Sequence, residues 1–274
     1  MPEGPEIRRA ADRIAKILVG QVIEEAWFAL PRLKRFNAEI TGMRVHRIDT
    51  RGKALLIRFE QGLTLYAHNQ LYGRWYLNKR GTLPKTGRTL RVALHTTTNS
   101  ALLYSASDIA VLLPEEELTH PFLSRIGPDV LDPQLTWRQV ARRLSNATFN
   151  NRSLASLYLD QHFIAGIGNY LRSEILFAAG VNPADKPRLL SQKLRNELAR
   201  QTLAISRRSY ESGGITLPAR KVKQLKALGL KRREYRFGVF DRAGDPCLTC
   251  GATIERSEAG SRRIYRCPVC QPDA

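Results

Sequence analysis

The first residues of the chain, Met1-Pro2-Glu3-Gly4-Pro5-Glu6, combine a potential amine nucleophile with a carboxylate. Once the initiator methionine is removed, Pro2 is a chain-terminal secondary amine. An α-amino group has a pKa of about 7.7 to 8.0, so a good fraction is unprotonated near neutral pH. Attack of this amine on an aldehyde-like sugar carbon would give an iminium, and Glu3 can transfer protons for that attack. A proline in second place is also common, and the stretch can simply start a helix.

The four cysteines form two C-x-x-C pairs near the end of the chain, Cys247 with Cys250 and Cys267 with Cys270. This spacing predicts a tetrahedral four-cysteine zinc site on β-hairpins. Because four thiolates leave no open position for water, the predicted Zn²⁺ is structural. Disulfides are the alternative, and they are disfavoured because no secretory signal precedes the first helix.

Two residues in Gly-containing turns are candidates for contacting phosphate. Lys53 lies in Thr50-Arg51-Gly52-Lys53-Ala54, a turn predicted between two strands, where it can point at a phosphate or a leaving group. Asn169 lies in Gly166-Ile167-Gly168-Asn169-Tyr170, a turn that leads into a helix whose N-terminus can hold a phosphate. The alternatives are a solvated lysine in a β-turn and an ordinary N-cap asparagine.

A loop tip and a hairpin supply further candidates. Gln70, Leu71 and Tyr72 follow a predicted strand, so they can present an amide, an aliphatic wedge and a ring that fill a gap in a base stack. The alternative places Leu71 and Tyr72 in the core as strand residues. Arg262 precedes the third cysteine on a predicted finger hairpin, where it can contact phosphate or remain a solvated arginine.

The overall charge predicts a polyanionic partner. The 274 residues contain 44 Lys and Arg against 25 Asp and Glu, a formal net charge of +19. Nucleic acid is the leading candidate. A membrane-spanning protein is disfavoured, because no apolar run approaches the roughly 20 residues that a spanning helix needs. A zinc deaminase is also disfavoured, because the chain contains no His-x-Glu motif.

Along the chain, the spacing of the apolar residues changes from one typical of strands to one typical of helices. A helix predicted from Ile7 to Leu18, with Gly20 as its C-cap, precedes short β-rich segments between Val22 and Leu113, typical of a sandwich or barrel. Prolines between Pro114 and Pro133 predict a domain boundary. Helical patterns follow at 137–144, 154–159, 170–179 and 189–210. The basic segment 211–234 is interpreted as flexible, with closure over a nucleic acid as the alternative, and 235–240 as β-like.

Five separated motifs are distributed from one end of the chain to the other: Pro2-Glu3-Gly4-Pro5-Glu6, Arg51-Gly52-Lys53, His68-Asn69-Gln70-Leu71-Tyr72-Gly73, Gly166-Ile167-Gly168-Asn169-Tyr170 and the four-cysteine tail. Taken together, they resemble the formamidopyrimidine-DNA glycosylase and endonuclease VIII family. Residues 65–73 and 103–109 are most similar to its bacterial endonuclease VIII branch.

The resemblance implies an α+β fold with two domains: an N-terminal helix plus β-sandwich, and a C-terminal helical domain with a helix-two-turn-helix and a four-cysteine zinc finger on a β-hairpin. The expected boundaries are 1–125 for the catalytic domain, 126–134 for a linker, 135–234 for the helical DNA-binding domain and 235–274 for the zinc finger.

The resemblance also implies a role for each candidate residue. Pro2 matches the amine that attacks the deoxyribose C1′, and Glu3 matches the acid/base beside it. Lys53 matches the general acid of β-elimination, and Arg262 matches the finger arginine of δ-elimination. The remaining matches are to DNA-binding positions: Gln70, Leu71 and Tyr72 fill the void left by an everted base, and Arg125 and Asn169 contact DNA.

The implied function is a bifunctional DNA glycosylase and AP lyase of base excision repair that removes oxidised pyrimidines from duplex DNA and cleaves the strand by β,δ-elimination. A non-catalytic zinc-finger module that binds distorted duplex is the alternative. We expect a monomer in the bacterial cytoplasm, associated with the nucleoid, with no membrane partner. Segment 211–234 does not match the lesion-capping loop of the purine-specific branch, so the lesion preference stays open.

Overall fold

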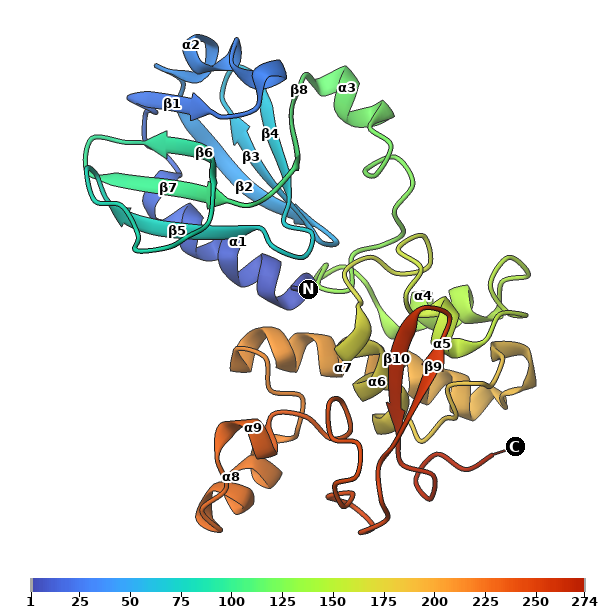
Figure 1. Cartoon of the computed structure of the whole chain (residues 1–274). Helices are drawn as coiled ribbons and strands as arrows, with labels where there is room; N and C mark the ends of the chain where they lie inside the picture. Colours follow the sequence, from blue (N-terminus) through green and yellow to red (C-terminus); the bar gives the residue numbers. More distant parts are fainter. Residues whose placement is uncertain (1, 274) are drawn as a thin grey trace. The chain divides into compact units, whose positions relative to one another are not determined.

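The computed structural model describes residues 2–273, which form two compact units (Figure 1). One unit contains Pro2 and Glu6–Arg125, and the other contains Glu3–Pro5 together with the chain from Ile126 onward. The finer boundaries expected for a linker, a helical domain and a zinc finger stay a prediction. Among the helices of residues 2–273, none combines the length and apolar character needed to cross a membrane.

The first unit is built on two four-stranded antiparallel sheets. One sheet has the order β2-β3-β4-β8, and the other has the order β1-β6-β7-β5. The strands are β1 Glu25–Phe28, β2 Val45–Arg51, β3 Ala54–Phe59, β4 Thr64–His68, β5 Arg74–Lys79, β6 Leu90–His95, β7 Asn99–Tyr104 and β8 Asp108–Leu112. The helices are α1 Gly4–Leu18, the 3-10 helix η1 Pro31–Leu33, α2 Phe36–Ile40 and α3 Pro114–Thr119. The expected β-sandwich with an N-terminal helix is confirmed.

Alternation along the strands explains why one of these sheets is buried on both faces. In β3, Leu55 and Ile57 belong to the main core, whereas Ala54 and Leu56 belong to a second cluster on the opposite face. Successive side chains of a strand point to opposite faces, so a nearly continuous apolar run needs cover on both sides. Helix α1 contributes to the main core with apolar residues at helical spacing: Ile7, Ala11, Ile14 and Leu18.

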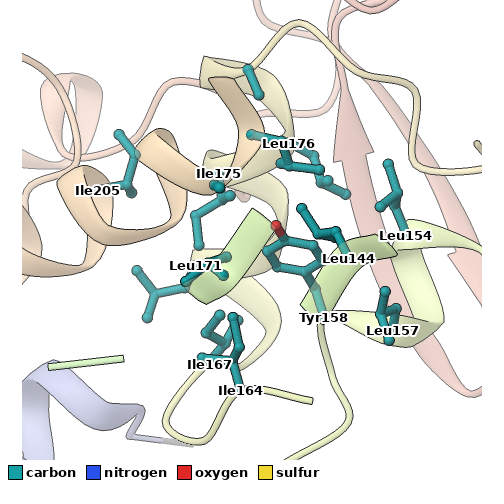
Figure 2. Packing of buried hydrophobic residues seen from close by; sticks show 14 of the residues in the cluster. Leu144, Leu154, Leu157, Tyr158, Ile164, Ile167, Leu171, Ile175, Leu176 and Ile205 are labelled. Atoms are coloured by element: carbon teal, nitrogen blue, oxygen red, sulfur yellow. The ribbon is translucent and has the colours of Figure 1, made fainter. Parts of the chain in front are cut away.

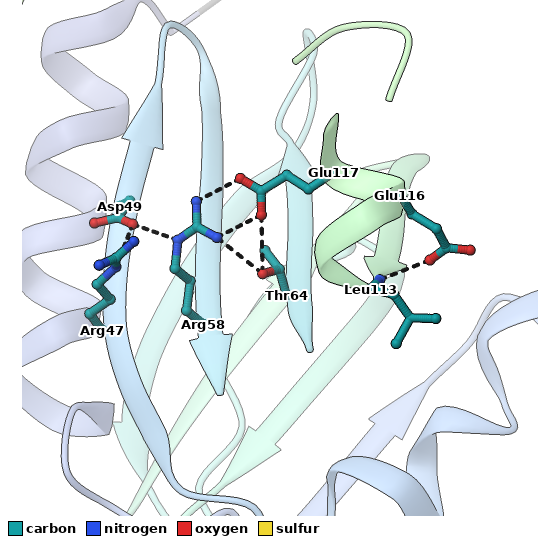
Figure 3. Close-up of polar contacts among 7 residues, drawn as sticks. All are labelled: Arg47, Asp49, Arg58, Thr64, Leu113, Glu116 and Glu117. Atoms are coloured by element: carbon teal, nitrogen blue, oxygen red, sulfur yellow. Dashed lines mark hydrogen bonds and ion pairs between the residues drawn. The ribbon is translucent and has the colours of Figure 1, made fainter. Parts of the chain in front are cut away.

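Helix α3 is tied to the sheet by a network around Arg58 (Figure 3). The guanidinium of Arg58 donates to Glu117 Oε2 and Oε1 at 2.6 and 2.7 Å, and its Nε donates to Asp49 Oδ2 at 2.6 Å. This bidentate pairing places charge-assisted hydrogen bonds between β3 and α3. The network therefore anchors the segment that follows the sandwich.

The second unit is mainly helical and has a core around Tyr158 (Figure 2). The phenol of Tyr158 is fully buried, and its Oη lies 2.8 Å from Thr202 Oγ1, so its polar group is satisfied within the core. The elements of this unit are α4 Trp137–Ser145, α5 Leu154–Leu157, α6 Asn169–Ala178, the 3-10 helix η2 Pro187–Leu189, α7 Gln192–Ser212, α8 Ala219–Ala227, α9 Arg232–Tyr235, β9 Glu255–Ala259 and β10 Arg262–Arg266.

The segment interpreted as flexible, 211–234, is instead largely helical. Helices α8 and α9 enclose a small apolar cluster: Ile215, Leu217, Leu225 and Tyr235. The flexible interpretation was wrong because the many Lys and Arg residues obscure four widely spaced apolar positions. The β-like interpretation of 235–240 was also wrong, because α9 ends at Tyr235 and the following residues form bends and turns, with no strand assigned to them.

Candidate active site and nucleic-acid interface

Glu3 is held at the N-terminus of α6, within the second unit. Its carboxylate accepts hydrogen bonds from the backbone N–H groups of Gly168 at 2.7 Å, Tyr170 at 2.8 Å and Leu171 at 3.3 Å. The side chain is only 3 % exposed. The first N–H groups of a helix have no partner within the helix, and they carry the positive end of its dipole. A buried carboxylate here satisfies these donors and is itself fixed in one orientation.

The turn before α6 leaves room for Glu3 only because it contains glycine. A Cβ on Gly168 would lie 2.4 Å from Glu3 Cδ, which is closer than side-chain atoms approach one another. On the same turn, Gly4 N donates to Gly166 O at 2.8 Å, and Gly166 has a φ of 96°, in the region that favours glycine. These contacts fix Glu3 and Gly4 against the turn. Pro2 therefore lies one residue from an anchored position, while Met1 lies outside the described residues.

Lys53 lies in a two-residue turn between β2 and β3. Its neighbour Gly52 has a φ of 62°, as tight turns between antiparallel strands require at their first central position. Ala54 pairs with His68 across the sheet, and the charge of Lys53 acts on the His68 imidazole. The turn therefore places Lys53 at the end of the sheet where β4 also ends.

The loop after β4 is organised by His68. The backbone N–H of Gln70 donates to His68 Nδ1 at 3.2 Å, and the Ser107 hydroxyl donates to Gln70 Oε1 at 2.8 Å. Gln70 has a φ of 50°, an uncommon conformation for a residue with a side chain. Burial lowers the pKa of His68; the Asp108 carboxylate acts in the opposite direction, and Lys53 adds to the lowering. A neutral imidazole can accept at Nδ1, so these effects favour the form that holds Gln70.

The tip of the same loop is exposed. Leu71 is 54 % exposed and Tyr72 is 65 % exposed, so their assignment to the core as strand residues was wrong. The loop is closed behind them by Gly73, whose N–H donates to Asn69 O at 2.7 Å and where a Cβ would meet that oxygen at 2.5 Å. The structure therefore presents an apolar and an aromatic side chain to solvent from a constrained turn.

Asn169 is the first residue of α6, and its side chain is bound by a buried arginine. Arg172 donates from Nη2 to Asn169 Oδ1 at 2.7 Å. The N-cap position belongs to Gly168, which makes no side-chain capping bond, so the reading of Asn169 as an ordinary N-cap was wrong. Sequence reasoning missed Arg172; the signal was its place three residues after Asn169, on the same face of a helix.

Arg262 and Arg125 lie at exposed positions in different parts of the chain. Arg262 is the first residue of β10 and pairs with Ala259 of β9. Its charge acts on the buried Arg172. Arg125 is exposed and is the last residue of the first unit. The second unit thus joins Glu3, Asn169 and the base of the Arg262 hairpin, whereas Lys53 and Gln70 lie in the first unit.

The four cysteines are gathered into one cluster whose Sγ atoms all lie within 4.8 Å of one another. Cys247 Sγ lies 3.9 Å from Cys270 Sγ, and Cys250 Sγ lies 3.4 Å from Cys267 Sγ. Zn–S bonds of about 2.3 Å in a tetrahedron place sulfur atoms roughly 3.8 Å apart, so the cluster fits such an ion. Backbone N–H groups of Thr249 and Cys270 point at Cys247 and Cys267. Burial opposes ionisation of Cys247, yet such hydrogen bonds lower its pKa to about 7, whereas burial raises the pKa of Cys267 and of Cys270. The cluster can therefore bind a metal ion.

Two family models match the chain. The formamidopyrimidine-DNA glycosylase N-terminal domain matches residues 1–107, and the formamidopyrimidine-DNA glycosylase H2TH domain matches residues 126–221. The chain is 49 % identical over 271 residues to "Endonuclease 8" of Enterobacter sp. (strain 638), and 49 % identical to "Endonuclease 8" of an Escherichia coli strain. Both alignments cover 99 % of this chain and 100 % of the relative.

The fold is similar to that of solved structures of Lactococcus lactis Fpg. A complex with DNA containing an abasic site aligns with a TM-score of 0.82 at 21 % identity and covers 99 % of this chain and 100 % of the other. A complex with DNA containing a benzylated Fapy-dG lesion aligns with a TM-score of 0.82 at 22 % identity and the same coverage. The two-domain α+β architecture expected from the sequence is thus confirmed.

Proposed function

The chain belongs to the formamidopyrimidine-DNA glycosylase and endonuclease VIII family, and from this premise we propose how its residues carry out base excision. It is a bifunctional DNA glycosylase and AP lyase of base excision repair, and its partner is duplex DNA with oxidised bases or abasic sites. Identity of 49 % along the full length of an endonuclease 8 is the observation that supports this function most strongly. We propose that the bases it removes are oxidised pyrimidines.

Pro2 is the nucleophile and Glu3 is its acid/base partner. After removal of Met1, the Pro2 nitrogen attacks C1′ of the damaged nucleotide, the C1′–base bond breaks, and the base leaves with a proton. The C1′–O4′ bond of the resulting aminal then breaks, and O4′ takes up a proton delivered by Glu3. The covalent product is an iminium between Pro2 and the opened sugar. The anchoring of Glu3 by three N–H groups supports this assignment, because it holds the carboxylate in one orientation, one residue from Pro2.

Strand cleavage follows by elimination. The iminium makes the C2′ proton acidic; its loss expels the 3′ phosphate, and a second elimination expels the 5′ phosphate, which leaves a one-nucleotide gap. We assign Lys53 to proton transfer in the first elimination and Arg262 to the second. The tight turn at Lys53 and the hairpin position of Arg262 support these roles, because both elements are short and rigidly connected.

DNA binding is assigned to residues around these groups. Gln70, Leu71 and Tyr72 fill the space left by the everted base, which the exposure of the loop tip supports. Asn169 binds a phosphate at the N-terminus of α6, and Arg125 contacts the backbone. The four-cysteine cluster holds one structural Zn²⁺ that fixes the β9–β10 hairpin. We further propose that the protein acts as a monomer at the bacterial nucleoid.

Borohydride trapping on an abasic duplex tests the function. Methionine-processed protein should form a covalent complex with the DNA and should convert the strand to the β,δ-elimination product on a denaturing gel. Pro2→Gly should be strongly impaired in both. The alternative, a non-catalytic zinc-finger module for distorted duplex, predicts salt-dependent binding without trapping or cleavage. Processed wild-type protein that binds but never traps would refute the enzyme assignment.

A further inference from the structure

Arg172 is a fully buried charge that the assigned chemistry does not use. Its exposed fraction is 0 %, and it lies in α6 three residues after Asn169. A buried arginine is costly unless its donors are paired, so each of its contacts is informative. Burial lowers the pKa of Arg172 to about 10, which leaves it protonated at neutral pH.

The guanidinium joins three separate segments. Nη1 donates to Ala155 O at 2.8 Å in α5, while Nη2 donates to Asn169 Oδ1 at 2.7 Å and to Arg263 O at 2.8 Å in β10. Among residues 2–273, Arg172 Nε is one of the buried polar atoms without a hydrogen-bond partner. The two terminal nitrogens of the Arg172 guanidinium therefore donate to these backbone carbonyl and side-chain amide oxygens.

These contacts connect two groups assigned to DNA phosphates. Holding Asn169 Oδ1 against Arg172 Nη2 fixes the rotamer of the amide, whose NH₂ group must then point away from the guanidinium. Holding Arg263 O fixes the backbone one residue from Arg262. We propose that Arg172 is a positioning residue that sets Asn169 and the start of β10 in one arrangement for binding the phosphates beside the lesion. This inference rests on the proposed function.

Arg172→Lys tests the inference, because lysine keeps the charge but lacks the planar fork. For a duplex with a tetrahydrofuran abasic analogue, Kd should rise on the order of 10-fold. On a true abasic duplex, the share of δ-elimination product should fall, while the trapped fraction at saturating DNA stays within about 3-fold, because lysine keeps the positive charge that interacts with Glu3. Zinc content and thermal melting report whether the variant is folded.

Arg195→Lys is the matched control. Arg195 also donates to backbone carbonyls, Pro187 O and Leu190 O, and to a side-chain amide, Gln192 Oε1. Its Nε is likewise without a partner among the described residues. Its contacts lie at η2 and the start of α7, so its loss should leave Kd and the product ratio within about 2-fold of wild type.

A double-mutant cycle tests whether Arg172 acts through Asn169. If it does, Arg172→Lys combined with Asn169→Ala should raise Kd no further than the larger single change. Additive effects on Kd would contradict the inference, as would an Arg172→Lys variant with the same Kd and product ratio as Arg195→Lys.

If neither variant folds, NMR of the unmodified protein decides: separate signals for the Arg172 Nη atoms support a guanidinium held in one orientation, and a rotationally averaged signal overturns it. Wild-type protein that fails to trap would instead refute the proposed function.

A second inference comes from the surface of α8 and α9. The apolar side of these helices is satisfied by its own cluster. Residues 219–235 contain seven Lys and Arg, of which all but Lys221 are exposed. They contain a single acid, Glu234, whose carboxylate already accepts from Lys231 N at 2.8 Å. Arg220, Lys223 and Lys226 recur at three-residue spacing and are exposed, so their like charges repel one another along one face.

We infer that α8 and α9 form an additional contact for the phosphate backbone of duplex DNA, resting on the proposed function. Changing Arg220, Lys223 and Arg233 to Gln should reduce the slope of log Kd against log salt by about 0.9 per lost contact. The control changes Lys34, Lys79 and Lys85 to Gln, removing the same charge from exposed positions in the first unit. An equal reduction in both variants, or none in the first, would overturn this contact, whereas a wild type that never traps would bear only on the enzyme assignment.

Discussion

Gly168 and Glu3 fit together as backbone donor and buried acceptor: the Gly168 N–H donates to Glu3 Oε2 at 2.7 Å, and a Cβ at Gly168 would lie 2.4 Å from Glu3 Cδ. The turn and the carboxylate cannot both keep their positions if any side chain is added. We therefore expect Gly168→Ala to displace Glu3 and reduce the rate of borohydride trapping on the order of 100-fold.

Overpacking at this turn should also cost about 1–3 kcal/mol of stability, measured by denaturant unfolding. Gly87→Ala is the control, because a Cβ at Gly87 meets nothing within 4 Å and should leave the trapping rate unchanged. A Gly168→Ala protein that traps at the wild-type rate would show that the position of Glu3 is not critical.

His68 should give the loop after β4 a dependence on pH. Because burial lowers its pKa, the unfolded chain binds the proton first as the pH falls below the ordinary value of 6.5. Stability contributed by the neutral imidazole is thus present above about pH 6.5 and decreases as the pH falls toward the lowered pKa. Hydrogen exchange of 68–73 should become faster over this range.

His68→Asn supplies the control for that pH effect, since its Oδ1 can still accept from Gln70 N–H but does not titrate. In this variant, the exchange rate of 68–73 should be nearly independent of pH over the same range, after correction for intrinsic exchange. In addition, Lys53→Met should raise the pKa of His68 in an NMR titration, because it removes a neighbouring positive charge. If the pKa of His68 is unchanged in this variant, the charge of Lys53 does not lie close enough to act on His68.

Glu117→Gln should weaken the attachment of α3 at neutral pH. The Arg58 hydrogen bonds hold the pKa of Glu117 below its ordinary 4.5, so the stabilisation is present above that value and is lost as the pH falls through the lowered pKa. Hydrogen bonds to charged groups contribute about 1.5–3 kcal/mol; with 21 % of each side chain exposed, we expect roughly 1 kcal/mol at pH 7.

The measurement is exchange protection of α3 in both proteins at pH 7 and in acid, where the difference should disappear. Glu116→Gln is a suitable comparison: Glu116 accepts from the backbone N–H of Leu113, the N-cap residue of α3, and is not part of the Arg58 network (Figure 3). If Glu117→Gln loses no more protection than Glu116→Gln at pH 7, the Arg58 pair does not anchor α3.

Removal of the metal should unfold the four-cysteine tail and abolish DNA binding, because its own apolar cluster is small: Val239, Cys247, Ile254, Tyr265 and Cys267. Circular dichroism and binding to an abasic-analogue duplex, before and after chelation with verified metal loss, measure both effects. Re-addition of Zn²⁺ should restore binding. Full binding by the metal-free protein would contradict a structural role.

Local patterns in the sequence predicted much of the fold. Short β-rich segments indicated that the strands lie between Val22 and Leu113, glycine marked the turn before Lys53, and the spacing of Cys247 and Cys250 with their partners predicted a cluster that the structure assembles. Each of these features depends on neighbours in the chain, so short windows are sufficient to find it.

Features that depend on tertiary contacts escaped prediction. Arg172 is polar in a helix and gives no sign that it is buried, because its partners lie in α5 and β10. The helical character of 211–234 depends on Leu217 and Tyr235 meeting across a loop. The assigned roles of Pro2 and Glu3 stay predictions.

Glu3–Pro5 clusters with the second unit, whereas the rest of α1 belongs to the first. The polypeptide is thus joined to the second unit at two places far apart in sequence, so residues 126–273 expressed alone would lack an integral piece of their own structure. A short synthetic peptide beginning Pro-Glu-Gly-Pro could supply the piece that residues 126–273 lack, and the nucleophile would then come from a separate molecule.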